Sequence, residues 1–271
     1  MGLAGGLKRE AWHATKCSVS RDGTPPFSVH SAPVIEVEGL VKAYQNLTAV
    51  DGLSFRVARG EVLGLVGPNG AGKTTTLRCL AGVLPPNAGT IRIGGFDLAE
   101  EPVEARRRLA FMPDEPRLFE YLTVEDHLAF AARMYGVADA ETRARALLEE
   151  LELTGKERAL PAELSRGMKQ KLVVACGLLH DPEVLIFDEP LTGIDPGGIR
   201  RMKQTIVRRA AAGAAVIVSS HLLPLVEEIC GRVLVLSRGK AVLFGTLDEI
   251  RAGAGGDAPL EEIFMRVTGG A

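Results

Sequence analysis

A glycine-rich stretch that ends in lysine and threonine carries the clearest chemistry in the chain. Residues 67–74 are Gly-Pro-Asn-Gly-Ala-Gly-Lys-Thr and match the pattern GxxxxGK[ST]. A chance match in a chain of this composition has a probability on the order of 1%, so a plain glycine-rich turn is the weaker explanation. In such a loop backbone N–H groups surround a polyphosphate, the lysine faces the β- and γ-phosphates, and the hydroxyl is offered to Mg²⁺. The nucleotide-binding residues expected here are Gly67, Pro68, Asn69, Gly70, Ala71, Gly72, Lys73, Thr74 and Thr75.

Two adjacent carboxylates follow a short apolar run further along the chain. Residues 184–187 are Val-Leu-Ile-Phe, and Asp188 and Glu189 come directly after them. At the end of a strand beside a phosphate loop, Asp188 is suited to bind Mg²⁺ and Glu189 to act as general base on the attacking water. The alternative is a strand end that is merely capped, which the phosphate loop makes less favoured.

A histidine and a helix start complete the candidate residues. His221 follows the apolar run 215–218 through two serines, and a histidine at the end of a parallel strand can reach a γ-phosphate. A lone histidine is more often an ordinary surface or core residue.

Ser165 is suited to cap a helix that has Gly167 in its first turn, and the free N–H groups of such a turn favour an anion. Since one phosphate loop already serves one nucleotide, this second anion-binding feature indicates a site that another subunit completes.

The elements that must position these residues are visible as hydrophobic patterns. Five short apolar runs are bounded by turn or polar residues, as in strands buried on both faces of a parallel sheet. They are 62–66, 109–112, 184–187, 215–218 and 233–236. Segments 34–38, 54–57 and 90–93 alternate like strands, and 75–81 is expected to be a helix. Residues 115–180 are expected to form a helical insertion, in which Thr123 caps the first helix and Gly136 ends it.

These patterns predict an α/β fold of the P-loop NTPase type. It should have a mostly parallel sheet flanked by helices, a small antiparallel β subdomain and the helical insertion. We expect the ATPase domain to span 34–267, after a disordered tail at 1–33 and before a short C-terminal end at 268–271.

Length and composition exclude several classes of protein. The chain has 271 residues, of which 46% are hydrophobic, and this length and composition exclude a wholly disordered chain and a disulfide-stapled miniprotein. The net charge of −2 shows no excess of basic residues that would indicate nucleic-acid binding. The longest stretch without acidic or basic residues, 210–226, falls short of the ~20 apolar residues of a spanning helix. The first residues lack an apolar signal core. The four cysteines include no CxxC pair, so we expect free thiols in a reducing cytosol.

The order of the motifs resembles the ATP-binding subunit of ABC transporters over about 34–267. Residues 67–74 resemble the Walker A motif, 184–189 the Walker B motif with its catalytic carboxylate, 164–168 the signature motif, and 192–195 the D-loop. The resemblance implies that two nucleotide-binding subunits enclose two Mg-ATP. Hydrolysis would then drive a separate integral-membrane permease, with this chain in the cytoplasm on the inner face of the cell membrane.

The same resemblance implies roles for individual residues. Glu189 and His221 would be catalytic, and Thr74 and Asp188 would bind Mg²⁺. Tyr44 would stack on the adenine of ATP. Ser165 and Gly167 would contact the ATP of the partner subunit.

The sequence departs from the family pattern in two motifs. Asp114 stands where the family usually has glutamine, and in the signature Arg166 and Met168 stand where glycine and glutamine are common. A carboxylate near a γ-phosphate needs a cation to offset its charge. We therefore expect Asp114 to act through the metal, directly or through water. The alternative is that Asp114 faces solvent and simply ends the strand.

The sequence also bears on the subfamily and on two alternative functions. Residues 164–171, 245–249 and 259–264 resemble bacterial exporters of the ABC-2 type, although 257–267 can also be a plain amphipathic terminal helix. A soluble ABC ATPase of chromosomes needs a long coiled coil that 271 residues cannot hold, and one of ribosomes usually has two such domains. A nucleotide-binding regulator that scarcely hydrolyses is suggested by Asp114.

Overall fold

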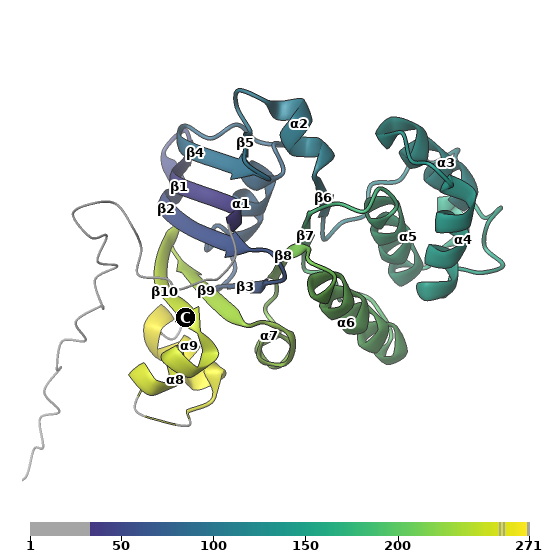
Figure 1. Cartoon of the computed structure of the whole chain (residues 1–271). Helices are drawn as coiled ribbons and strands as arrows, with labels where there is room; N and C mark the ends of the chain where they lie inside the picture. Colours follow the sequence, from purple (N-terminus) through teal and green to yellow (C-terminus); the bar gives the residue numbers. More distant parts are fainter. Residues whose placement is uncertain (1–32, 255, 257, 270–271) are drawn as a thin grey trace, which may run out of the picture. The chain divides into compact units, whose positions relative to one another are not determined.

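Two β-sheets organise the part of the chain that the computed structural model describes, residues 33–254, 256 and 258–269 (Figure 1). The four-stranded sheet is antiparallel, in the order β2-β1-β4-β5, and the six-stranded sheet has the order β10-β9-β3-β8-β7-β6. The first sheet contains β1 (Pro33–Tyr44), β2 (Leu47–Ala58), β4 (Ala88–Ile93) and β5 (Phe96–Asp97). The second contains β3 (Val62–Val66), β6 (Leu109–Met112), β7 (Val184–Asp188), β8 (Ala215–Ser219), β9 (Arg232–Ser237) and β10 (Lys240–Thr246).

The six-stranded sheet is parallel except for its edge strand β10. Every residue of β3, β7 and β8 is buried, which confirms the expectation from their uninterrupted apolar runs. Alternate side chains of β7 enter two different cores: Ile186 packs on the side of the antiparallel sheet, and Phe187 on the side of the large helices. The expected α/β class, with a mostly parallel sheet and a small antiparallel sheet, is confirmed.

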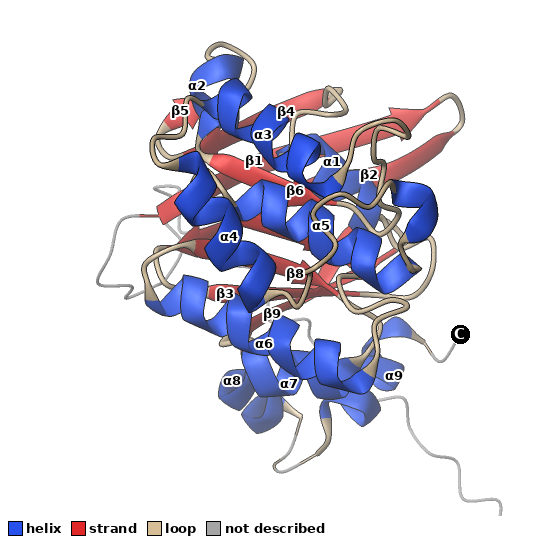
Figure 2. Ribbon diagram, turned by 90° about the vertical axis from the view of Figure 1, so that its right-hand side faces the viewer, coloured by secondary structure: helices blue, strands red, loops and turns tan. Residues whose placement is uncertain are grey.

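Helices cover the six-stranded sheet, and α3, α4, α5 and α6 lie in front of its strands in Figure 2. Between β6 and β7 come α3 (Val124–Tyr135), α4 (Ala140–Glu150), the short 3-10 helix η1 (Pro161–Glu163) and α5 (Arg166–Leu178). The other helices are α1 (Lys73–Leu80), α2 (Pro102–Arg107), α6 (Pro196–Ala211), α7 (Leu223–Ile229), α8 (Leu247–Gly253) and α9 (Leu260–Thr268).

The ends of α3 follow the expected local chemistry. The hydroxyl of Thr123 accepts a hydrogen bond from the N–H of Asp126, and the Asp126 carboxylate accepts one from the N–H of Thr123. Gly136 ends the helix with φ at 65°, a left-handed conformation that glycine adopts without steric cost.

Some boundaries differ from the expectations. β1 and β2 are each 12 residues long, against five and four expected, because polar residues such as Lys42 and Asp51 on the exposed face interrupt the apolar alternation. Pro33, expected in the tail, begins β1. The edge strand β10 was not predicted, since most of its residues are exposed or half-buried and show no clear period. The rest of the expected tail, residues 1–32, and residues 270–271 lie outside the described residues.

No helix in the described part of the chain has both the length and the apolar character needed to cross a bilayer. Cys79, Cys176 and Cys230 are unpaired thiols, whereas Cys17 lies outside the described residues. Burial raises the pKa of Cys176 and of Cys230 to about 12, so both remain protonated at neutral pH and are poor nucleophiles.

Candidate nucleotide site

The predicted phosphate loop connects β3 to α1, and packing requires its glycines. A Cβ atom on Gly72 would lie 2.3 Å from the carbonyl oxygen of Ala49, and the φ of Gly72 is +104°. A Cβ atom on Gly67 would lie 2.5 Å from the carbonyl oxygen of Leu236. Helix α1 begins without a side-chain cap and has no acidic residue in its first turn. Its first N–H groups are therefore free to bind an anion.

The side chain of Lys73 turns back into this loop. Its Nζ atom donates hydrogen bonds to the carbonyl oxygens of Gly67 at 2.6 Å and Pro68 at 3.3 Å. Burial lowers the pKa of Lys73, while the charges of Glu189 and Asp188 act in the opposite direction. The ammonium group of Lys73 therefore already points into the loop. Phosphate oxygens can replace the two carbonyl oxygens as its hydrogen-bond acceptors.

Thr74 and Asp188 meet beside the loop. The hydroxyl of Thr74 lies 3.4 Å from Oδ1 of Asp188, and Asp188 is buried at the end of β7. Within the described ranges no three His, Cys, Asp or Glu side chains form a cluster that could hold a metal. One hydroxyl and one carboxylate fit Mg²⁺, which keeps several waters and takes further oxygen ligands from substrate phosphates.

Glu189 and His221 are in direct contact. Oε2 of Glu189 lies 2.8 Å from Nδ1 of His221, and the backbone N–H of His221 points to the same oxygen at 3.4 Å. Glu189 has φ at +50°, a region that costs a non-glycine residue roughly 1 kcal/mol or more. In this backbone conformation the carboxylate contacts His221.

Tyr44 lies at the exposed end of β1. Its partner across the β1–β2 hairpin is Leu47, two residues before Ala49, whose carbonyl oxygen packs against Gly72. The ring is 43% exposed, and Nζ of Lys42 lies 5.3 Å from its centroid. An exposed aromatic face close to the phosphate loop is suited to stack on a base.

Ser165 and Gly167 stand at the start of α5. Ser165 is exposed and caps the helix by accepting a hydrogen bond from the N–H of Met168 at 3.2 Å. Gly167 is buried, and a Cβ atom there would lie 2.9 Å from the carbonyl oxygen of Gly193. Contact with the segment 192–195 of the same chain is therefore enough to require glycine at 167, a reason that the sequence did not reveal.

Two of the three residues that depart from the family pattern, Asp114 and Arg166, are in contact. Nη2 of Arg166 lies 3.2 Å from Oδ1 of Asp114, with the side chains 55% and 47% exposed. The expected role of Asp114 at the metal stays a prediction. Its partner in this structure is a guanidinium, 52 positions away along the chain, which sequence spacing alone does not indicate.

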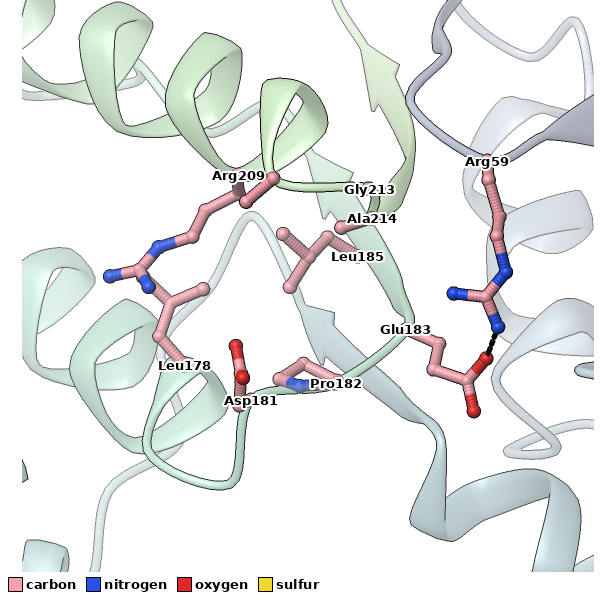
Figure 3. Close-up of a pocket in the computed structure, with 10 residues that line it drawn as sticks. Arg59, Leu178, Asp181, Pro182, Glu183, Leu185, Arg209, Gly213 and Ala214 are labelled. Carbon is pink, nitrogen blue, oxygen red and sulfur yellow. Dashed lines mark hydrogen bonds and ion pairs between the residues drawn. The ribbon is translucent and has the colours of Figure 1, made fainter.

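A separate cavity of about 180 Å³ lies at the opposite end of β7 (Figure 3). Its lining includes the ion pair of Arg59 and Glu183 on one side and Arg209 on the other. Ligands of parallel sheets bind at the carboxyl ends of the strands. This cavity lies next to Glu183, just before β7 begins, and so it is distinct from the phosphate loop.

Comparisons with known proteins agree with this geometry. Residues 50–192 match the family model described as ABC transporter. The linearmycin resistance ATP-binding protein LnrL of Bacillus subtilis is 35% identical over 84% of this chain and 74% of that protein. The Nod factor export ATP-binding protein I of Paraburkholderia xenovorans is 41% identical over 78% of this chain and 70% of that protein.

A solved structure of the ATP-binding subunit of an ABC transporter is 38% identical, with a TM-score of 0.83 over 87% of this chain and 99% of that one. The family match covers the phosphate loop, the start of α5, and Asp188 and Glu189. The chain belongs to the ATP-binding subunits of the ABC transporter family.

Proposed function

We propose that this ABC-type ATPase pairs with a second nucleotide-binding subunit around two Mg-ATP and drives export through a separate permease. The observation that carries the proposal is that Thr74, next to Lys73 in the phosphate loop, lies 3.4 Å from Asp188, which Glu189 follows directly. The relatives named above support the direction of transport, because one is named for Nod factor export and the other for resistance to linearmycin.

The chemistry assigns a role to each side chain. Lys73 binds the β- and γ-phosphates, and Thr74 and Asp188 hold Mg²⁺, which when bound offsets the charge of the phosphates. Glu189 accepts a proton from the water that attacks the γ-phosphorus, and the bond to the bridging oxygen breaks to release ADP. His221 orients the Glu189 carboxylate through the 2.8 Å contact.

The start of α5 supports a second nucleotide-binding subunit. Ser165 is exposed, and because its oxygen accepts the N–H of Met168, its own hydroxyl proton remains available to donate. Ser165 and Gly167 would face the triphosphate of the partner subunit, where the helix start favours negative charge.

A surface cluster of aromatic and aliphatic residues supports contact with a permease on the inner face of the cell membrane. Tyr121 is 89% and Phe119 56% exposed, and the rings of Phe119 and Phe130 meet edge to face at 5.3 Å. These residues line a shallow apolar groove together with Leu118 and Leu122. Exposed apolar grooves of this kind mark protein contacts, and this one follows Asp114 closely in the chain.

We predict that the double substitution Phe119→Ser and Tyr121→Ser separates membrane association from ATP hydrolysis. The variant should hydrolyse ATP at the wild-type rate, because neither residue touches the phosphate loop, but bind inside-out membrane vesicles of the source organism at least about tenfold more weakly. Sedimentation of the purified chain with such vesicles measures this. Val207→Ser, which alters an exposed apolar residue of α6, is the matched control. Binding equal to wild type by the double variant would show that the groove is not the membrane contact.

We predict that Asp114→Asn weakens the dependence on Mg²⁺ while leaving ATP affinity largely intact. Groups that act on a metal through its ligands change its affinity by roughly tenfold or more, so the Mg²⁺ concentration for half-maximal turnover should rise by about tenfold. Arg166→Gln is the control, because it breaks the ion pair but leaves the carboxylate in place. Superimposable Mg²⁺ titrations of wild type and Asp114→Asn would exclude Asp114 from the metal site.

A further inference from the structure

One buried hydroxyl contacts both carboxylate-bearing residues of the site. Ser219 is the last residue of β8, has no exposed surface, and is paired in register with Asp188 on β7. Its Oγ atom lies 2.6 Å from Oδ1 of Asp188 and 3.0 Å from the backbone nitrogen of Glu189. We propose that Ser219 is a positioning residue that sets the orientation of the Asp188 carboxylate and of the Glu189 backbone for ATP hydrolysis.

The direction of each hydrogen bond follows from the partners. An ionised carboxylate can only accept, and a backbone N–H can only donate. Ser219 therefore donates its proton to Asp188 and accepts one from Glu189. A distance of 2.6 Å is typical of an O–H group bound to a charged oxygen. The bond holds Oδ1 of Asp188 in place, on the same oxygen that the Thr74 hydroxyl approaches.

The second contact acts on a strained backbone. Glu189 has φ at +50°, and such a conformation persists only where the surroundings hold it. Its N–H group faces two oxygens of Ser219, Oγ at 3.0 Å and the carbonyl oxygen at 3.2 Å. The carbonyl contact remains in any variant at 219, but the side-chain contact does not. Loss of the hydroxyl would loosen the conformation that aims Glu189 at His221.

A neighbouring serine offers a matched control. Ser220 is also buried, but its hydroxyl accepts from the N–H of Leu222 and contacts neither Asp188 nor Glu189. If Ser219 only satisfied a polar group in the core, Ser219→Ala and Ser220→Ala would both lower the melting temperature and affect nothing else. A positioning role predicts an additional change at the metal and in turnover.

The proposal rests on the proposed ATPase function, and the test compares Ser219→Ala, Ser219→Thr and Ser220→Ala in the full chain. For Ser219→Ala we expect kcat to fall by about 10- to 100-fold with KM for ATP within about threefold of wild type, and half-saturation by Mg²⁺ to move to higher concentration. Ser219→Thr retains the hydroxyl and should restore most of the rate. Ser220→Ala should keep both parameters near wild type.

A binding measurement makes the result independent of turnover. Trinitrophenyl-ATP fluorescence, titrated with and without Mg²⁺, reports how much the metal adds to nucleotide affinity. That gain should be smaller in Ser219→Ala than in wild type or Ser220→Ala. If wild type failed to hydrolyse ATP, the proposed function would be wrong, yet this titration would still test Ser219.

The proposal is overturned if folded Ser219→Ala differs from wild type only in a lower melting temperature. Its kcat and the increase in nucleotide affinity caused by Mg²⁺ would then both equal those of wild type. It is equally overturned if Ser219→Thr, folded by the same thermal criterion, is as impaired as Ser219→Ala. Should the threonine not fit in β8, Ser219→Cys replaces it. The weaker thiol donor should then give a rate between those of alanine and wild type.

Discussion

The Lys73→Ala chain is expected to bind ATP at least about 30-fold more weakly than wild type. Truncating one partner of a buried, hydrogen-bonded charge pair costs roughly 2–5 kcal/mol, and each 1.4 kcal/mol is a factor of ten in affinity. The Lys73 ammonium is buried and already directed into the loop by its bonds to Gly67 and Pro68. Alanine also leaves those two carbonyl oxygens facing the phosphates with no cation between them.

Isothermal titration with ATP and Mg²⁺ measures the loss. The control is Lys240→Ala, which removes an exposed lysine that pairs with Asp51 at 3.2 Å, outside the loop. That variant should bind like wild type. Affinity unchanged within error in Lys73→Ala would remove Lys73 from the nucleotide site and with it the proposed geometry of the loop.

The Glu189→Gln chain is expected to bind ATP normally and to hydrolyse it about 10²–10⁴-fold more slowly, the usual cost of removing a general base. Glutamine keeps the shape of the side chain and an oxygen for the contact with His221 at 2.8 Å. It cannot take the proton of the attacking water. Because bound ATP then persists, a dimer should accumulate in the presence of ATP.

Steady-state turnover and size-exclusion chromatography with ATP test the two parts of this expectation. Glu228→Gln is the matched control, since that carboxylate pairs with Lys203 on the surface. Turnover equal to wild type in Glu189→Gln would disprove its role as base. If wild type itself scarcely turned over, the weakly hydrolysing regulator suggested by Asp114 would be favoured.

Local signals account for the parts of the fold that were predicted from the sequence. The apolar run 62–66 coincides with β3 and 109–112 with β6, because strands buried on both faces need uninterrupted apolar residues. Thr123 and Gly136 mark the ends of α3 for reasons of hydrogen bonding and backbone conformation within a few residues. The phosphate loop was likewise recognisable because its chemistry lies within nine consecutive positions.

The features that were missed depend on contacts between distant segments. The pairing of Asp114 with Arg166 joins the loop after β6 to the first residue of α5, and the separation of the two along the chain carries no periodic signal. The contact of Ser219 with Asp188 depends on β7 and β8 being neighbours in a given register. One sequence signal was available, since Ser219 directly follows the apolar run 215–218 and Asp188 directly follows the run 184–187. Parallel strands bring their carboxyl ends to the same edge of a sheet, so these two polar residues could have been expected to lie close together.

The close packing of Gly167 on Gly193 has a mechanical consequence. The segment from Glu189 to α6 contains Gly193, and α5 presents its first turn at the surface next to Ser165. Because backbone atoms meet there with no side chain between them, neither segment can shift without displacing the other. The chain therefore has a stiff linkage between the segment that follows Glu189 and the start of α5. In the proposed dimer, a displacement at one triphosphate would reach the other as a movement of the backbone and not as a change of charge.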